Sequence, residues 1–163
     1  MKTSWTVSAL AASAVIWASA CAGDEPEVDC DSEPGCVEAG DDVDVEIERP
    51  ATPGAPAPQG PMTVEYLVSG CGLALPGACK GRRGCGHVHL AVPDCGVTAE
   101  SHRGEAVVDL GQCDPGEHAI FVLIHDDKHA VFVRDGAPIW KKATVHVEAR
   151  KKKEHRKGDD RCD

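Results

Sequence analysis

The sequence predicts an all-β protein that folds as one small sandwich. Between residues 61 and 149, short runs rich in valine and isoleucine are separated by glycine, proline, aspartate and cysteine, which is the pattern of strands and turns. No segment keeps a helical period over three turns. Strict alternation of apolar and polar side chains also marks the last run as a strand. The six predicted strands cover residues 63–70, 87–93, 105–111, 118–125, 130–133 and 143–149.

Each run carries its own signal. Residues 63–70, 105–111 and 130–133 are short apolar runs that end at turn residues. Residues 118–125, "HAIFVLIH", are apolar on both faces and predict a central strand. In residues 143–149, "ATVHVEA", valines and alanines share one face and polar residues the other. The sequence between residues 71 and 85 predicts a loop held by its cysteines.

The start of the chain predicts an export signal. Lys2 provides a charge, and residues 6–20 form an apolar run that is too short for a membrane span of about 20 residues. Residues 18–20, Ala-Ser-Ala, form a small-residue cleavage site, and Cys21 follows directly. The junction resembles a bacterial lipobox, which implies lipidation of Cys21; plain cleavage that leaves a free cysteine is the alternative. Residues 1–20 are thus expected to be a lipoprotein signal peptide.

The cysteine count favours lipidation. The chain has 9 cysteines, so acylation of Cys21 leaves an even number for disulfides in an exported protein. The residue after Cys21 is alanine rather than aspartate, and the lipobox resemblance then implies an outer-membrane lipoprotein that faces the periplasm or the cell exterior. Cys30–Cys36 and Cys71–Cys79 are expected as local disulfides. The disulfide candidates are Cys30, Cys36, Cys71, Cys79, Cys85, Cys95, Cys113 and Cys162.

Composition indicates a tether before the sandwich and a charged tail after it. Residues 21–60 are acidic and rich in proline and glycine, and we expect a disordered spacer there. The sandwich is expected at residues 61–149, and the tail, residues 150–163, is expected to be solvated. The formal net charge of −10 argues against nucleic-acid binding. The expected partners are the membrane, through the N-terminal lipid, and an unidentified envelope protein or small ligand.

His87 and His89 raise the question of a metal site. Two residues apart on a strand, they point to the same side, opposite the apolar residues that should face the core. Such a pair can share a copper or zinc ion, but a site needs three or four ligands. Structural hydrogen bonding by the histidines is the competing interpretation. The candidates for the remaining ligands are His102, His125, Asp126 and His129.

Three segments resemble a family of small domains of unknown function in bacterial exported proteins. "GHVHLAV" at residues 86–92, "PGEHAIFVLIHDDKH" at residues 115–129 and "APIWKKATVHV" at residues 137–147 match its motifs. The resemblance implies an immunoglobulin-like β-sandwich and places His118, Asp126 and His129 on family positions. This chain departs from the family at Val88, where a third histidine is frequent, and at Lys141, where serine is usual.

The sequence predicts a binding protein rather than an enzyme. Ser69 and Ser101 lack a nucleophile-elbow motif, and no nucleophilic constellation is apparent. The leading prediction is a lipid-anchored cell-envelope protein with a non-enzymatic β-sandwich for binding or interaction. The alternative is a periplasmic copper- or zinc-binding module that uses the histidine cluster. A metalloenzyme of the superoxide dismutase type is the least favoured alternative, because the glycine-rich motifs and long loops of that enzyme are missing.

Overall fold

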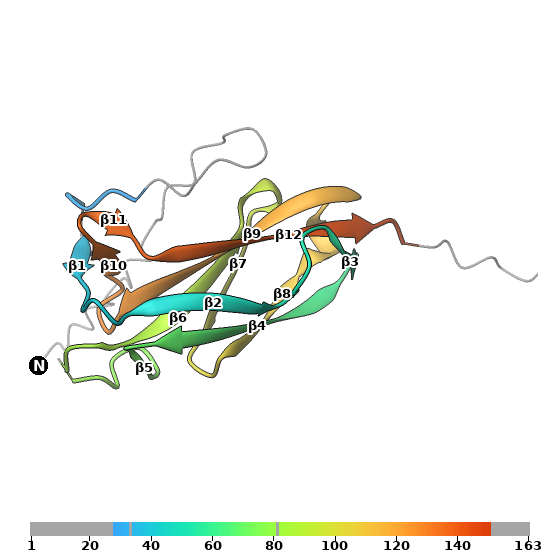
Figure 1. The fold of residues 1–163 in the computed structure, drawn as a ribbon. Helices are drawn as coiled ribbons and strands as arrows, with labels where there is room; N and C mark the ends of the chain where they lie inside the picture. Colours follow the sequence, from blue (N-terminus) through green and yellow to red (C-terminus); the bar gives the residue numbers. More distant parts are fainter. Residues whose placement is uncertain (1–27, 33, 81, 151–163) are drawn as a thin grey trace, which may run out of the picture.

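The structure is a computed structural model that describes residues 28–32, 34–80 and 82–150. Two β-sheets pack face to face, with β2 and β4 lying over β6, β9 and β12 (Figure 1). The predicted all-β sandwich is confirmed. The expected signal segment, Cys21, Cys162 and the expected tail after residue 150 lie outside the described residues.

The larger sheet has nine strands and is built around β9 (Gly116–Asp126). β6 (Cys85–Val92) pairs with one edge of β9, and β12 (Trp140–Glu148) pairs with the other. β10 follows β12 along that second edge and pairs with the end of β9 at His125. The other strands of this sheet are β1 (Cys36–Glu38), β3 (Ala55–Pro58), β5 (Gly72–Leu73), β7 (Val97–Ser101), β10 (Val131–Arg134) and β11 (Ala137–Pro138).

The smaller sheet has the order β2 (Asp44–Arg49), β4 (Pro61–Ser69) and β8 (Glu105–Asp109). Two short 3-10 turns, η1 (Pro93–Cys95) and η2 (Leu110–Gln112), join strands. The main core lies between the sheets and is made almost entirely of aliphatic side chains. Its fully buried members include Val64, Val88, Leu90, Val108, Ile120, Val122, Ile124, Val145 and Val147.

The central strand is buried on both faces, as its sequence predicts. Ile120, Val122 and Ile124 point into the main core. On the opposite face of β9, a second apolar cluster consists of Ala119, Phe121 and Leu123, with Val28 and Trp140 packed against it. The outer face of the larger sheet is therefore partly apolar along β9, and this is the face that carries His87 and His89.

The predicted boundary between tether and sandwich at residue 61 is wrong. β1, β2 and β3 all precede that residue and pair with later strands. The sequence "DVDVEIE" alternates, so that Val43 and Val45 are 1% exposed in the core while the acids between them face outward. β3 contains two prolines and pairs only with β12, which is an edge position where missing N–H donors are tolerated.

Three disulfides join the described cysteines. Cys30–Cys36 is confirmed. The expected Cys71–Cys79 bond is wrong, because Cys79 bonds to Cys85 at the start of β6. Cys95–Cys113 is the third bond, and Cys71 has no disulfide partner among the described residues. The pairing follows from strand geometry: β5 runs parallel to β6, and the loop between these two strands returns Cys79 to Cys85.

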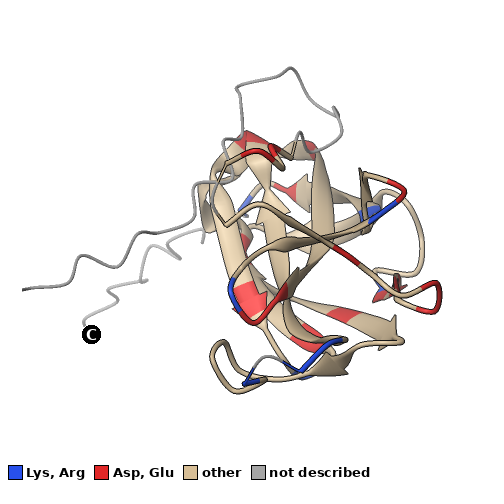
Figure 2. Ribbon diagram, turned by 90° about the vertical axis from the view of Figure 1, so that its left-hand side faces the viewer, with Lys and Arg blue, Asp and Glu red and all other residues tan. Residues whose placement is uncertain are grey.

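Within the described ranges, no helix has the length and apolar character needed to cross a membrane. Acidic positions lie on several separate loops and strands of the sandwich, with basic positions between some of them (Figure 2).

Candidate metal centre

The site begins where β6 approaches β9 at Gly86. A Cβ atom on Gly86 would overlap the backbone carbonyl of His125, so only glycine allows the two strands to come this close. Gly86 pairs with Asp126, and the next pair in register is His87 with His125. The glycine of the "GHVH" motif therefore brings the first histidine directly opposite the end of the central strand.

The two histidines of β6 lie on the outer face of the larger sheet, as predicted from their spacing. Val88 and Leu90 are 0% exposed in the main core, which leaves His87 and His89 on the other side. His87 is nevertheless only 1% exposed, and the side chain of His89 is 20% exposed. This face is therefore not an ordinary solvated strand surface at the two histidines.

A tight turn after β9 brings the third histidine over them. Asp126 Oδ1 accepts hydrogen bonds from the backbone N–H groups of Lys128 at 2.7 Å and Ala130 at 2.8 Å. His129 adopts a left-handed backbone conformation with φ of 68° in this turn. Its ring centroid lies 4.7 Å from that of His87 and 5.4 Å from that of His89.

The fourth member is Glu100 on β7, which the sequence analysis missed. Pro93–Cys95 and Gly96 turn the chain so that β7 pairs with β6, and Glu100 falls directly opposite His89. Glu100 Oε1 lies 3.5 Å from His89 Nε2 and 3.8 Å from His129 Nε2. The hairpin register is the signal that could have found it, once residues 97–101 are recognised as a strand.

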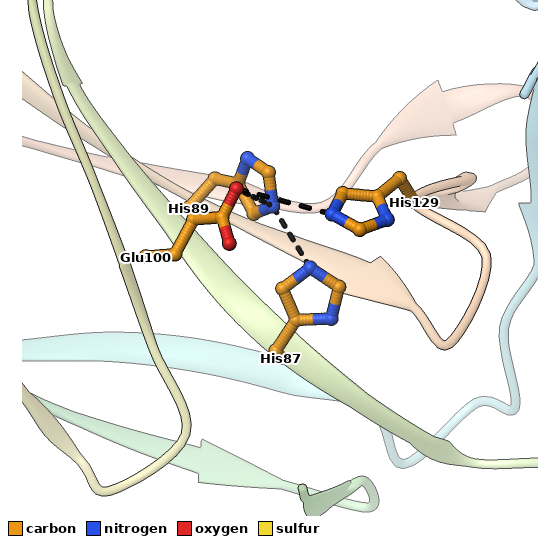
Figure 3. A group of neighbouring side chains, drawn as sticks. All are labelled: His87, His89, Glu100 and His129. Atoms are coloured by element: carbon orange, nitrogen blue, oxygen red, sulfur yellow. Dashed lines mark hydrogen bonds and ion pairs between the residues drawn. The ribbon is translucent and has the colours of Figure 1, made fainter. Parts of the chain in front are cut away.

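Four potential ligand atoms thus converge from two neighbouring strands and a turn (Figure 3). One atom each from His87, His89, Glu100 and His129 lie within 4.8 Å of one another. The Nε2 atoms of His87 and His89 are 2.8 Å apart. These residues could hold one metal ion.

The separations suit a shared ion. A metal–nitrogen bond of about 2.0–2.1 Å places two ligand atoms about 2.9 Å apart at a right angle and about 3.4 Å apart at a tetrahedral angle. The distances of 2.8 Å from His87 to His89 and 3.5 Å from His89 to Glu100 lie close to these values. His129 Nε2 lies 3.8 Å from Glu100 Oε1, which is slightly longer than these separations.

Two buried ring nitrogens argue against a purely structural role for the histidines. His125 Nδ1–H donates to the backbone carbonyl of His129 at 3.0 Å, which leaves the lone pair on Nε2 in the neutral ring. Neither His125 Nε2 nor His87 Nδ1 has a hydrogen-bond partner among the described residues. Histidines kept for hydrogen bonding are normally satisfied when buried.

Burial keeps these imidazoles neutral. It lowers the pKa of His87, of His89 and of His125, in the last case to about 4. The neighbouring histidines lower all three pKa values further, because each would carry like charge. At neutral pH these rings are therefore in the uncharged form that can bind a cation. His87 Nε2 and His89 Nε2 share a hydrogen bond, so one of the two rings must move its proton to Nδ1 before both Nε2 atoms can ligate.

The other predicted ligands have different places. The ring of His125 stacks on that of His89 with centroids 3.9 Å apart, beside the four ligand atoms rather than among them. The Asp126 carboxylate shapes the turn, so its predicted role as a ligand is not supported. His102 accepts a hydrogen bond from the neighbouring Arg103, away from the cluster.

No protein-family model and no curated protein matches the sequence. Among solved structures, the chain is similar to the crystal structure of an engineered protein, with 15% identity and a TM-score of 0.41. The similarity covers 66% of this chain and 20% of the engineered protein.

Proposed function

We propose that this protein is a metal-binding β-sandwich of the cell envelope that holds one copper or zinc ion without catalysing a reaction. The ligands are His87, His89, His129 and Glu100. The proposal rests above all on one observation, the convergence of three imidazoles and a carboxylate within 4.8 Å.

The chemistry of the donors supports copper or zinc. Neutral imidazole is a ligand that both metals favour, whereas calcium and magnesium take oxygen ligands. The single carboxylate of Glu100 offsets part of the charge of a divalent ion. His125 supports the site from beside it, through its stacking on His89 and its hydrogen bond to the His129 backbone.

The lipobox-like junction at Cys21 supports the proposed location of the protein in the cell envelope. Lipidation of Cys21 anchors the protein in the outer membrane, and the resemblance to exported domains of unknown function agrees with that compartment. An oxidising compartment also suits three disulfides. Labelling of whole cells with a radioactive fatty acid tests the anchor: the protein carries label, and Cys21→Ser does not.

Isothermal titration with zinc and with copper tests the metal site. The mature chain is purified without an affinity tag and with disulfides intact, and compared with His87→Ala/His89→Ala and with His146→Ala. His146 is exposed on β12, outside the cluster, and provides the matched control.

The parent chain and the control are expected to bind one equivalent of metal, with affinity reduced at least a hundredfold in the double variant. Equal binding by the parent chain and the double variant, or no binding by the parent, would contradict the proposal.

A further inference from the structure

A second group of possible metal ligands lies at the other end of β9. Cys95, Cys113 and His118 each offer one ligand atom, and these atoms lie within 4.8 Å of one another. His118 and His125 are seven residues apart on one strand, which separates the two groups by about 20 Å. The second group is therefore independent of the first.

His118 is held in an orientation that suits ligation. Its Nε2–H donates to the backbone carbonyl of Asp114 at 2.7 Å, so the lone pair of the neutral ring is on Nδ1. Nδ1 lies 3.5 Å from Cys95 Sγ and 3.5 Å from Asp94 Oδ2. The side chains of His118 and Asp94 are 10% and 22% exposed, so the group is partly shielded from water.

These separations match tetrahedral zinc. Bonds of about 2.3 Å to sulfur and about 2.0–2.1 Å to nitrogen or oxygen place sulfur and nitrogen about 3.6 Å apart, and nitrogen and oxygen about 3.4 Å apart. The corresponding distances here are both 3.5 Å. His118 Nδ1 therefore lies at a ligand-to-ligand distance from both Cys95 Sγ and Asp94 Oδ2. Cys95, Cys113 and His118 form the group within 4.8 Å, and Asp94 lies beside it.

In the structure the two sulfurs form a disulfide, which excludes metal. We propose that reduction of Cys95–Cys113 opens a second metal site in which Cys95, Cys113 and His118 bind zinc and Asp94 is the nearest further ligand. Re-oxidation by a small-molecule disulfide, which takes up the two electrons and becomes two thiols, re-forms Cys95–Cys113 and releases the ion. Whether Cys95 and Cys113 are oxidised or reduced would then determine whether this end of the sandwich binds a metal.

The reaction balances with a dithiol as reductant. A thiolate of the dithiol attacks Sγ of Cys95, the less buried of the two residues, and Cys113 leaves as a thiolate. The second thiol of the reductant then attacks the mixed disulfide and releases Cys95. The dithiol becomes a disulfide, and the protein gains two electrons and two protons. Zinc then displaces both thiol protons.

Cobalt(II) provides the test, because thiolate ligands give it a charge-transfer band in the near ultraviolet that imidazole and carboxylate ligands do not. The mature chain is reduced with a phosphine, which adds no thiol, and titrated with cobalt. The same titration is run on Cys95→Ser/Cys113→Ser and on Cys79→Ser/Cys85→Ser, which removes a different disulfide as a matched control.

The charge-transfer band is expected in the reduced parent and in the Cys79→Ser/Cys85→Ser control. It should be absent from the oxidised parent and from Cys95→Ser/Cys113→Ser. His118→Ala should weaken cobalt binding at least tenfold, whereas His146→Ala should leave it unchanged. Zinc should abolish the band by competition.

Three titration outcomes overturn the proposal: no band in the reduced parent, a band that survives loss of Cys95 and Cys113, or equal affinities in His118→Ala and His146→Ala. Circular dichroism is recorded alongside. A reduced chain that loses its β-sheet signal and does not regain it with zinc also overturns the proposal. Each result can be told from failure of the first site, because the histidine cluster contains no thiolate.

Discussion

His87 and His125 lie directly opposite each other on β6 and β9, and each has one buried ring nitrogen without a hydrogen-bond partner among the described residues. An unsatisfied buried polar group costs about 1–3 kcal/mol of stability. Apolar residues at these two positions would extend the cluster of Ala119, Phe121 and Leu123 along the same face. The two histidines therefore cost stability at these positions, and stability alone does not explain why they are there.

Loss of the Glu100 carboxylate should weaken metal binding. In Glu100→Gln the shape is kept, but the negative charge that offsets the cation is lost. We expect the affinity for zinc to fall at least tenfold, which is about 1.4 kcal/mol. Competition with a chelating dye measures it. Glu148→Gln, an exposed position on β12, is the control and should bind as the parent does; equal affinities in the two variants would exclude Glu100 as a ligand.

The close approach at Gly86 should tolerate no side chain. In Gly86→Ala the new methyl group would overlap the His125 carbonyl and push β6 away from β9. We expect a loss of about 1–3 kcal/mol in the free energy of unfolding and weaker metal binding, because His87 moves with the strand. Urea unfolding measures the first effect.

Gly60→Ala is the matched control for this substitution. A Cβ at Gly60 would have no other atom within 4 Å, so the free energy of unfolding of Gly60→Ala should stay close to that of the parent. Similar unfolding midpoints for the two alanine variants would show that the approach of β6 to β9 does not depend on glycine.

Two substitutions at Asp126 distinguish a role in shaping the turn from a role as a metal ligand. Asp126→Ala leaves the backbone N–H groups of Lys128 and Ala130 without their acceptor, and should cost about 1–2 kcal/mol and displace His129. Asp126→Asn keeps the acceptor oxygen, so stability and zinc affinity should remain near those of the parent. A large loss of zinc affinity in Asp126→Asn with unchanged stability would instead identify Asp126 as a ligand.

Acid should destabilise the metal-free protein through its histidines. Burial holds the pKa of His125 at about 4, below the ordinary value of 6.5. As pH falls below 6.5 the unfolded chain takes up a proton before the folded chain does, so the free energy of unfolding decreases toward pH 4. The slope for this residue is at most about 1.4 kcal/mol per pH unit.

Urea unfolding at several pH values between 7.5 and 5 measures this slope. His125→Gln should reduce the slope, and His146→Gln should not. Stability that is independent of pH over this range would contradict the account of a buried, neutral cluster.

Much of the fold could be predicted because apolar side chains alternate along single strands. The alternation of Val145 and Val147 with His146 and the two-sided burial of β9 both follow from local sequence. The acidic segment before residue 61 differs from its predicted disorder because apolar residues alternate with its acids, and net charge alone does not reveal that period. In β2, Val45 has the same alternation between acids, and its strand pairs with β4.

Only the part of the site that depends on the alternation of side chains along one strand could be predicted from the sequence. Strand parity places His87 and His89 on one face. Position 88 points into the main core, so a histidine there would not join the cluster, and the valine found at this position removes no ligand. Glu100 could not be found this way, because its place depends on the register between β6 and β7. The position of His129 depends on the backbone of a turn, and residue spacing does not specify it.

The most direct test of the central claim is anomalous diffraction at the zinc absorption edge from crystals of the zinc-loaded chain with its disulfides intact. We predict one strong peak about 2.0–2.2 Å from a ring nitrogen of each of His87, His89 and His129 and from a carboxylate oxygen of Glu100. Anomalous peaks only at residues outside the cluster, such as His102 or His146, with none among these four, would contradict the assignment of a metal site to this face of the sandwich.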